Sequence, residues 1–428
     1  MSAAQMGSFF AAMTLRRTFA SPTNWNAAEE AAFAHFGDQL RATLSPEIGF
    51  LLCPDNDFRP ADRINCSLVD ALGTVLCGAH LSYLETRKVL ESILTGDASP
   101  ALAAAVLIGQ RMNLESVEES RAYLDASRGA QAVVPVKLES LTHLGEPYDG
   151  ATRYFRPSVF VAAVRAALGR PTVLHGVDSM PPKWGVTDEQ VVNALGARTD
   201  LDLDAAKALL EDPNVGWVYV SQREYAPHLY QLRHLREHIK KRPPWAATEK
   251  VQQFFSCGGN DCMVAGIYHH GYDELLLQLM WERGIRVGMV MKGEEGSSFY
   301  SLRRGASSTR SAMAMNYTRG FSRHDRQRSE FAHDVDPLAY GFEYGSSPRP
   351  SSVTAAGFAA AGAAALRGVP GHVFDRIALN VGVMDYLLGF STNPQTSIQE
   401  ARTAMLNGQA VAHLQAYVTQ VPARPSSA

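Results

Sequence analysis

The chain contains 428 residues, of which 46% are hydrophobic and 19% are charged. This is the composition of an ordinary soluble globular protein, and its length suits two or three domains. The formal net charge is -3 at pH 7, which disfavours a general nucleic-acid-binding protein because that class normally carries a basic surplus. No apolar run reaches the length of a membrane span.

The cysteines favour a reducing compartment. Their number is odd, their spacing is irregular and no secretory signal precedes them, so reduced thiols in the cytoplasm are the simplest interpretation. Cys257 and Cys262 bracket the segment GGND, but a zinc site would need a second pair at closer spacing. The full set is Cys53, Cys66, Cys77, Cys257 and Cys262.

Residues 1–26 carry no acidic side chain and show no helical periodicity. We expect them to form an N-terminal extension that frays from the folded domains. An organellar transit peptide is the alternative, although Arg16 and Arg17 are the only charged residues of the segment.

Residues 27–127 are predicted to form a helical domain, which a segment at about 226–250 completes. The spacing of Ala, Leu and Phe predicts a first helix over residues 27–44. The helices that follow are separated by short loops, which favours a compact bundle. These later helices begin near Leu81, Pro100 and Ser116.

From residue 128 onward, short apolar segments alternate with helical ones, which predicts a mostly parallel sheet flanked by helices. The expected fold class is therefore α/β, with an N-terminal helical domain and a larger domain over residues 128–428. Residues 303–334 are rich in Ser and Arg and are expected to form a long loop. The predicted strands are Val133–Val136, Thr172–Leu174, Val215–Val220, Met263–Tyr268 and Val287–Met291.

The stretch from Thr172 to Gly196 predicts a strand, a His-Gly turn, a small-residue loop and then a helix. Backbone N–H groups and the positive end of the helix both face such a loop, which makes it an anion site. Lys183 lies within the loop and adds a full positive charge. The pattern favours phosphate or diphosphate as part of the ligand, and the alternative is a turn whose glycines serve geometry alone.

The order of several motifs resembles that of the anthranilate phosphoribosyltransferase family, which shares its fold with pyrimidine nucleoside phosphorylases. The segment SILTGDASPALAAAVLIGQRMNLESVEE is similar to the N-terminal helices of that family, and GMVMKGEEG (residues 288–296) to a late strand with its acidic turn. ALNVGVMDYLLG and ARTAMLNGQAVAHL resemble its closing helices. Arg236 and Arg242 match its paired arginines near the acceptor site. The residues at the spacing of its phosphate-binding loop are His175, Gly176, Ser179, Lys183, Gly185 and Asp188.

The resemblance extends from about Leu81 to Leu414 and implies a function. A member of this family transfers a phosphoribosyl group from phosphoribosyl pyrophosphate to an aromatic or heterocyclic acceptor such as anthranilate. The resemblance also implies Mg²⁺ as cofactor and a homodimer formed through the N-terminal helices. Because diphosphate leaves from an oxocarbenium-like sugar, the protein would mainly position two substrates and stabilise the departing charge.

Two segments depart from the pattern of the family. Its diphosphate loop Gly-Thr-Gly-Gly-Asp corresponds here to GEPYDG (residues 145–150), where Glu146 adds a negative charge and Pro147 removes an N–H donor. Its Asn-x-Ser-Thr motif corresponds to RPSV (residues 156–159), in which the serine is retained. These changes indicate a divergent member.

A third departure concerns the metal. The Asp-Glu pair that helps to hold Mg²⁺ in the family falls at Ser298 and Phe299, so Glu294 and Glu295 are the acidic residues that remain nearby. We therefore expect a metal site formed by Ser158, Glu294 and Glu295, with Mg²⁺ bound partly through its waters.

The expected substrate-binding residues include Arg156 as a phosphate clamp and Lys183 as a phosphate contact. His175 is expected either to line the site or to orient its turn. No catalytic residue is assigned. The full set is Gly145, Asp149, Gly150, Arg156, Ser158, His175, Gly176, Ser179, Lys183, Arg236 and Arg242.

Two further functions stay open beside phosphoribosyl transfer. The altered diphosphate loop and the missing acidic pair favour a non-catalytic descendant that binds phosphate, a nucleotide or nucleic acid, although the net charge disfavours nucleic acid. A phosphorolytic enzyme that uses free phosphate is the third class. For the leading hypothesis, the expected partners are a phosphorylated sugar donor, a small aromatic acceptor and a second copy of the chain, with no membrane.

Overall fold

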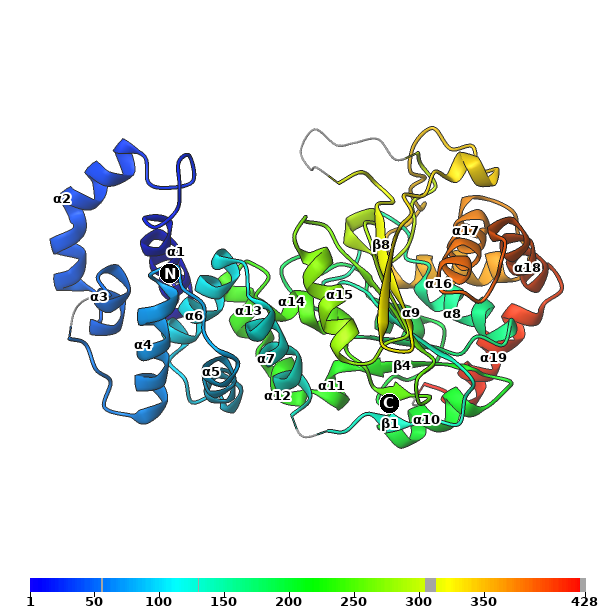
Figure 1. Ribbon diagram of the computed structural model, residues 1–428, viewed down its shortest axis with the longest axis horizontal. Helices are drawn as coiled ribbons and strands as arrows, with labels where there is room; N and C mark the ends of the chain where they lie inside the picture. Colours follow the sequence, from blue (N-terminus) through cyan, green and yellow to red (C-terminus); the bar gives the residue numbers. More distant parts are fainter. Residues whose placement is uncertain (55–56, 130, 305–312, 424–428) are drawn as a thin grey trace, which may run out of the picture. The chain divides into compact units, whose positions relative to one another are not determined.

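The computed structural model of the chain describes residues 1–54, 57–129, 131–304 and 313–423. Contacts divide the chain into two compact units. The first unit comprises residues 1–129 and 228–248, and the second comprises residues 130–227 and 249–428 (Figure 1). Within the described ranges, no helix combines the length and the apolar character that a membrane crossing needs.

The first unit is a bundle of helices. Its helices are α1 (Ala3–Arg16), α2 (Ala27–Thr43), α3 (Pro46–Leu52), α4 (Arg63–Val75), α5 (Tyr83–Thr95), α6 (Pro100–Asn113), α7 (Val117–Arg128), α12 (Pro227–Gln231), α13 (Arg233–Ile239) and α14 (Trp245–Thr248). α6 lies at the centre, because every residue from Ala101 to Gln110 is buried and α1, α3, α4 and α13 pack against it. The small and apolar residues of α6 on all sides suit this central position.

The N-terminal segment belongs to this bundle, which differs from the extension that we expected for residues 1–26. A capping box at Ser2 starts α1, and Ala4 and Ala11 are buried. A Cβ at Gly7 would lie 2.1 Å from the carbonyl oxygen of Ala101, so α1 and α6 touch through their backbones. The contact depends on small side chains, which give a weaker sequence signal for a buried helix face than large apolar residues do.

The second unit contains a central sheet. Its strands are β2 (Leu141–Gly145), β3 (Thr172–Gly176), β4 (Trp217–Ser221), β6 (Asp261–Gly266), β7 (Val287–Met291), β8 (Thr318–His324) and β9 (Gln327–Ala332). The seven strands lie in the order β4-β3-β2-β6-β7-β8-β9. Neighbours from β4 to β7 run parallel, whereas β8 and β9 join antiparallel at one edge. A separate parallel pair consists of β1 (Val134–Pro135) and β5 (Phe255–Ser256).

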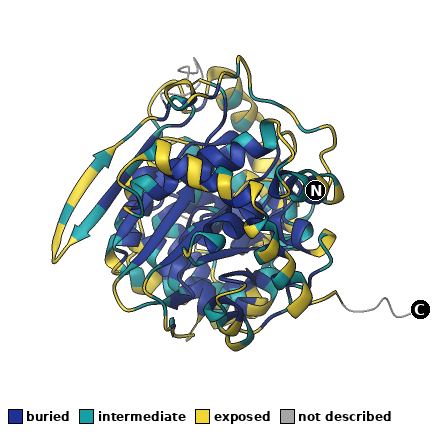
Figure 2. Ribbon diagram, turned by 90° about the vertical axis from the view of Figure 1, so that its right-hand side faces the viewer, coloured by how far each residue is buried: buried dark blue, intermediate teal, exposed yellow. Residues whose placement is uncertain are grey.

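Helices cover the sheet. They are α8 (Ser158–Ala167), α9 (Asp188–Ala194), α10 (Leu203–Glu211), α11 (Gln222–Tyr225), α15 (Tyr272–Glu282), α16 (Ala355–Leu366), α17 (His372–Leu387), α18 (Pro394–Leu406) and α19 (Gln409–Gln420), with short 3-10 turns η1 (Glu249–Val251), η2 (Glu294–Gly296) and η3 (Pro337–Tyr340). α8 packs on β3 and β4, and α17, α18 and α19 pack against α8. α15 packs on β7 and β8. The parallel strands of the central sheet, β2, β3, β4, β6 and β7, are buried throughout (Figure 2). The predicted fold class is confirmed.

The second unit also corrects two predictions. β2 was not among the predicted strands, although it is fully buried. The region 303–334, which we expected to be a long loop, contains the antiparallel hairpin of β8 and β9. Residues 305–312 of that expected loop lie outside the described residues. Three of the four exposed positions of β9 carry polar or charged side chains, Gln327, Ser329 and Glu330, which is typical of an edge strand.

Candidate functional site

The candidate site is built from three loops at the carboxyl ends of parallel strands of the central sheet. The first loop (residues 146–157) follows β2 and the second (residues 177–187) follows β3, and these strands end side by side because Gly145 pairs with His175. The third loop (residues 292–299) follows β7. The carboxyl ends of parallel strands are where α/β proteins usually bind ligands.

The first and second loops are fastened to each other through their backbones. Ala151 and Val186 exchange two hydrogen bonds of 2.9 and 2.8 Å, and the Gly185 N–H donates to the Asp149 carbonyl at 2.9 Å. Gly150 has a φ of +77°, and a Cβ there would lie 2.4 Å from the Gly185 carbonyl carbon. Glycine is therefore required at this contact for both reasons.

Lys183 reaches from the second loop to the other two. Its ammonium group donates to the Gly150 carbonyl at 2.8 Å and lies 3.5 Å from the Asp149 carboxylate and 3.8 Å from the Glu295 carboxylate. The structure thus brings together Asp149, Gly150, Lys183 and Glu295, four of the residues that the sequence analysis selected.

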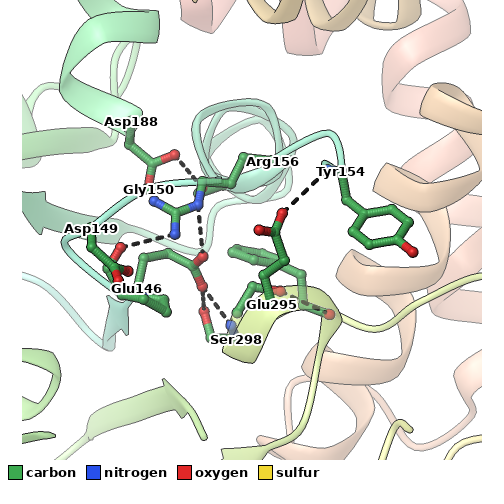
Figure 3. Close-up of polar contacts among 12 residues, drawn as sticks. Glu146, Asp149, Gly150, Tyr154, Arg156, Asp188, Glu295 and Ser298 are labelled. Carbon is green, nitrogen blue, oxygen red and sulfur yellow. Dashed lines mark hydrogen bonds and ion pairs between the residues drawn. The ribbon is translucent and has the colours of Figure 1, made fainter. Parts of the chain in front are cut away.

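Glu295 in the third loop points into a cluster of N–H donors in the first loop (Figure 3). Its carboxylate accepts the Thr152 N–H at 3.2 Å, the Arg153 N–H at 3.1 Å and the Tyr154 N–H at 3.3 Å. The Thr152 hydroxyl donates to it as well, at 2.8 Å. Burial by itself would raise the pKa of Glu295, but Lys183 and the Thr152 donors outweigh it, so the pKa is lowered and the group is charged at neutral pH.

Arg156 forms an ion pair with Glu146, another residue of the first loop. Its guanidinium lies 3.2 Å from the Glu146 carboxylate and donates to the Pro147 carbonyl at 2.9 Å. The side chains of Arg156 and Glu146 are 5% and 2% exposed, and Figure 3 shows them directed at each other. The expected role of Arg156 as a phosphate clamp therefore has to compete with a buried ion pair.

Glu146 also binds the third loop, and this contact explains one departure from the family pattern. The Ser298 N–H donates to the Glu146 carboxylate at 2.5 Å, and the Ser298 hydroxyl donates to the same oxygen. Burial raises the pKa of Glu146, and the charge of Asp188 adds to this, while Arg156 acts in the opposite direction. An acidic residue at position 298 would place a second carboxylate against Glu146, so serine suits this position. From the sequence, Glu146 was predicted to be an unfavourable charge for diphosphate. Its partners Arg156 and Ser298 were not predicted.

The three expected Mg²⁺ ligands do not fit a metal. The Ser158 hydroxyl donates to Asp188 at 2.6 Å, the Glu294 carboxylate accepts the Ser301 hydroxyl at 2.5 Å, and Glu295 is held by the first loop. Across the described residues, no group of three or more His, Cys, Asp or Glu side chains could hold a metal ion. Octahedral Mg²⁺ needs oxygen atoms that are free to converge on one point, and here each carboxylate already accepts protein hydrogen bonds. These contacts argue against the predicted metal set, which stays a prediction that a Mg²⁺ titration can test.

His175 contacts the first loop through the side chain of Tyr148. Its Nδ1 lies 2.7 Å from the Tyr148 hydroxyl, which is also 2.8 Å from the Tyr225 hydroxyl. The imidazole is buried, and burial lowers its pKa to about 3. The ring is therefore neutral at physiological pH, and its contact with Tyr148 favours the second of the two roles expected for it.

Acidification is expected to destabilise the second unit through His175. The unfolded chain binds a proton here with a pKa of about 6.5, whereas the folded imidazole, with a pKa of about 3, does not. Stability is therefore complete above pH 6.5 and falls by about 2 kcal/mol between pH 7 and pH 5. Denaturation at both pH values, compared with His175→Gln, measures this slope. An equal slope in the variant would contradict the assignment.

The remaining predicted residues of the second unit have structural contacts. A Cβ at Gly145 would lie 1.7 Å from the Lys250 carbonyl oxygen, and a Cβ at Gly176 would lie 2.7 Å from the Tyr219 hydroxyl. These two glycines therefore allow close packing at the ends of β2 and β3. The Ser179 N–H donates to the carboxylate of Asp178, its neighbour in sequence, at 2.8 Å.

The two arginines predicted for the acceptor lie in the first unit, apart from the other candidates in the chain. Arg236 belongs to α13 and is buried, whereas Arg242 follows that helix and is exposed. The residues that the structure brings together in the three loops therefore do not include this pair, and its role in acceptor binding stays a prediction.

Comparisons with known proteins agree with this architecture. Residues 69–130 match the family model described as "Glycosyl transferase family, helical bundle domain". The anthranilate phosphoribosyltransferase of Pelotomaculum thermopropionicum is 28% identical over 358 residues, which cover 82% of this chain and 95% of the relative. That of Laribacter hongkongensis is 24% identical over 342 residues, which cover 79% of this chain and 94% of the relative.

Solved structures share the fold. Anthranilate phosphoribosyltransferase from Thermus thermophilus superposes with a TM-score of 0.63 at 21% identity, covering 82% of this chain and 98% of that chain. The Saccharomyces cerevisiae protein, solved in complex with phosphoribosyl pyrophosphate and Mg, gives a TM-score of 0.63 at 14% identity and covers 82% of this chain and 97% of that chain. Over about four fifths of its length, the chain is thus similar in sequence to anthranilate phosphoribosyltransferases, and it shares their fold.

Proposed function

We propose that this protein is a pentosyltransferase that moves a phosphoribosyl group from phosphoribosyl pyrophosphate to an aromatic or heterocyclic acceptor. The observation that carries the proposal is the convergence of Lys183 and the N–H groups of Thr152, Arg153 and Tyr154 at the carboxyl edge of the sheet. This donor set suits a phosphorylated ligand. Relatives across more than three quarters of the chain are anthranilate phosphoribosyltransferases, which supports the reaction.

The reaction requires little covalent chemistry from the protein. The bond between the anomeric carbon and the diphosphate oxygen breaks, a bond to the acceptor nitrogen forms, and the proton displaced from that nitrogen passes to solvent. Lys183 and the first-loop N–H groups would bind and orient the phosphorylated sugar and stabilise charge on the departing diphosphate. The residues present do not fit Mg²⁺, so no step is assigned to the metal.

An assay with phosphoribosyl pyrophosphate and anthranilate tests the proposal. We expect release of diphosphate that depends on both compounds, and chromatography that identifies the phosphoribosylated acceptor. If anthranilate is inert, a set of other aromatic amines and heterocycles replaces it. Tight binding of the donor with no diphosphate release for any acceptor would contradict a transferase.

A non-catalytic binding protein is the second candidate, and one observation favours it. The Glu146 carboxylate is buried against Arg156 where the related diphosphate loop has threonine, and the Glu295 carboxylate fills the N–H donors of the first loop. Both negative charges oppose a diphosphate. A thermal shift with oligonucleotide, without a shift from phosphoribosyl pyrophosphate, would support this candidate.

We also propose a cytoplasmic homodimer associated through the first unit. The family resemblance supports the dimer, and Phe9, Phe36 and Leu84 are exposed apolar side chains of that unit. All five cysteines are free, which suits a reducing compartment. Light scattering at micromolar concentration should give twice the chain mass of 46.6 kDa, and the mass of one chain would count against the dimer.

A further inference from the structure

The Glu295 carboxylate sits where an external oxyanion would sit. Three successive backbone N–H groups, one hydroxyl and the cations of Lys183 and Arg153, each 3.8 Å away, surround it. Successive N–H groups of a loop form a concavity that binds phosphate in many proteins. Four protein donors, the N–H groups of Thr152, Arg153 and Tyr154 and the Thr152 hydroxyl, thus converge on the two carboxylate oxygens.

We propose that Glu295 is a built-in competitor, whose carboxylate occupies a phosphate site formed by Thr152, Arg153, Tyr154 and Lys183 and is displaced when a phosphorylated ligand binds. The inference rests on the proposed function only in the phosphorylated nature of the ligand. It adds a means of restraint to the site, because the protein must give up an internal contact before it accepts phosphate.

The site is open to an incoming ligand from the side of the first loop. Thr152 and Arg153 are exposed, and the Arg153 side chain is 57% exposed while that of Glu295 is 5% exposed. Trp184, next to Lys183, is 48% exposed. A phosphate can therefore reach this part of the first loop from solvent, and Arg153, which lies 3.8 Å from the Glu295 carboxylate, can pair with it instead.

The exchange needs rotation of one side chain and no movement of the sheet. The neighbouring Glu294 stays anchored by the Ser301 hydroxyl at 2.5 Å, so the third loop keeps its position when Glu295 leaves. The backbone of Glu295 has φ 56° and ψ 21°. This is a left-handed conformation that residues other than glycine and asparagine rarely adopt. Its contacts with the first loop offset the strain of this conformation.

Phosphate has an advantage over the carboxylate in this exchange. A phosphate monoester carries close to two negative charges and three acceptor oxygens at neutral pH, whereas Glu295 brings one charge and two oxygens. Lys183 and Arg153 can both pair with the larger charge. The competition is therefore reversible and is decided by the phosphate concentration.

Titration of the full-length protein with inorganic phosphate and with diphosphate, in the absence of an acceptor, tests the proposal. Calorimetry compares the unaltered protein with Glu295→Gln, which removes the charge, and with Glu295→Gly, which suits φ 56°. We expect both variants to bind phosphate about tenfold more tightly or better, a change equivalent to about 1.4 kcal/mol or more. Glu330→Gln on the exposed strand β9 removes the same charge elsewhere and should leave the affinity unchanged.

Thermal melting separates a binding effect from misfolding, because both Glu295 variants should melt cooperatively. Adding Lys183→Ala to Glu295→Gly should return phosphate affinity toward that of the unaltered protein, which locates the site. Unchanged or weaker phosphate binding in folded Glu295 variants, or no binding in either, would overturn the proposal. Tighter phosphate binding without transfer activity would refute the proposed function alone, and transfer activity without tighter binding would refute the competitor alone.

Discussion

Replacing Arg165 by methionine is expected to lower the free energy of unfolding by about 3–5 kcal/mol, the usual cost of breaking a buried ion pair. Arg165 in α8 is paired with Asp385 in α17, and both side chains are 0% exposed. The guanidinium also donates to the Thr142 hydroxyl in β2 at 2.7 Å and to the Thr172 hydroxyl in β3 at 3.1 Å. One side chain thus joins two helices to two strands that lead into the site.

The loss is large because Asp385 would keep its charge in a dry environment with Arg170 as the remaining partner, at 2.5 Å. Chemical denaturation measures the effect. Arg304→Met is the matched control, since Arg304 pairs with Asp336 at 3.0 Å while 67% exposed, and an exposed pair contributes about 0–1 kcal/mol. Equal destabilisation by the two variants would contradict a special role of Arg165. Combining Arg165→Met with Asp385→Leu should recover part of the loss, because the buried carboxylate is then absent and Arg170 keeps Glu400 as its partner at 3.1 Å.

The sequence predicted the sheet well where strands are continuous apolar runs and failed where they are not. β7 was predicted with its observed bounds, Val287–Met291, since all five residues are apolar or small. β2 was missed because its middle residues Thr142 and His143 are polar. They are nevertheless buried, since Thr142 accepts the Arg165 hydrogen bond and His143 Nε2 accepts the Phe254 N–H at 3.3 Å. Partners distant in sequence make such a strand possible, and a local pattern does not show them.

The sequence identified residues of the candidate site that contact the backbone of another loop. It did not identify the ion pairs between side chains. Gly150 and Lys183 were both selected from the sequence as substrate-binding residues, and the structure brings them together, with the Lys183 ammonium 2.8 Å from the Gly150 carbonyl. The ion pair of Arg156 with Glu146 was not predicted. Glu146 was compared only with the related diphosphate loop, and the sequence does not show which side chains lie near it in space. Similarly, Glu295 was predicted to bind a metal. In the structure, its carboxylate accepts hydrogen bonds from Arg153 and Tyr154, some 140 residues earlier in the chain.

Lys183→Ala is expected to weaken binding of phosphoribosyl pyrophosphate by about 1.5–3 kcal/mol, the range for hydrogen bonds to charged groups. The ammonium group lies at the junction of the three loops, within 3.8 Å of the Glu295 carboxylate and 3.5 Å of the Asp149 carboxylate. Its side chain is 19% exposed, so a bound phosphate would meet a partly desolvated charge. Calorimetry with the donor measures the change.

The control for this experiment is Lys207→Ala on α10, where the ammonium is 4.0 Å from Glu211 and the side chain is 30% exposed. It removes the same charge from the same unit and should leave donor affinity unchanged. An unchanged dissociation constant in Lys183→Ala would place the phosphorylated ligand away from the three loops, and the proposed function would lose its main structural support.

The size of the Lys183 effect depends on what Glu295 does. Lysine attracts the internal carboxylate as well as the ligand, so Lys183→Ala weakens both competitors, and part of the loss in donor affinity is offset. In Glu295→Gly the carboxylate is gone and that offset disappears. The cost of Lys183→Ala should therefore be greater in the Glu295→Gly background than in the unaltered protein, which a double-mutant cycle measures as a coupling free energy. Equal costs in the two backgrounds would mean that the lysine and the glutamate act independently on the donor.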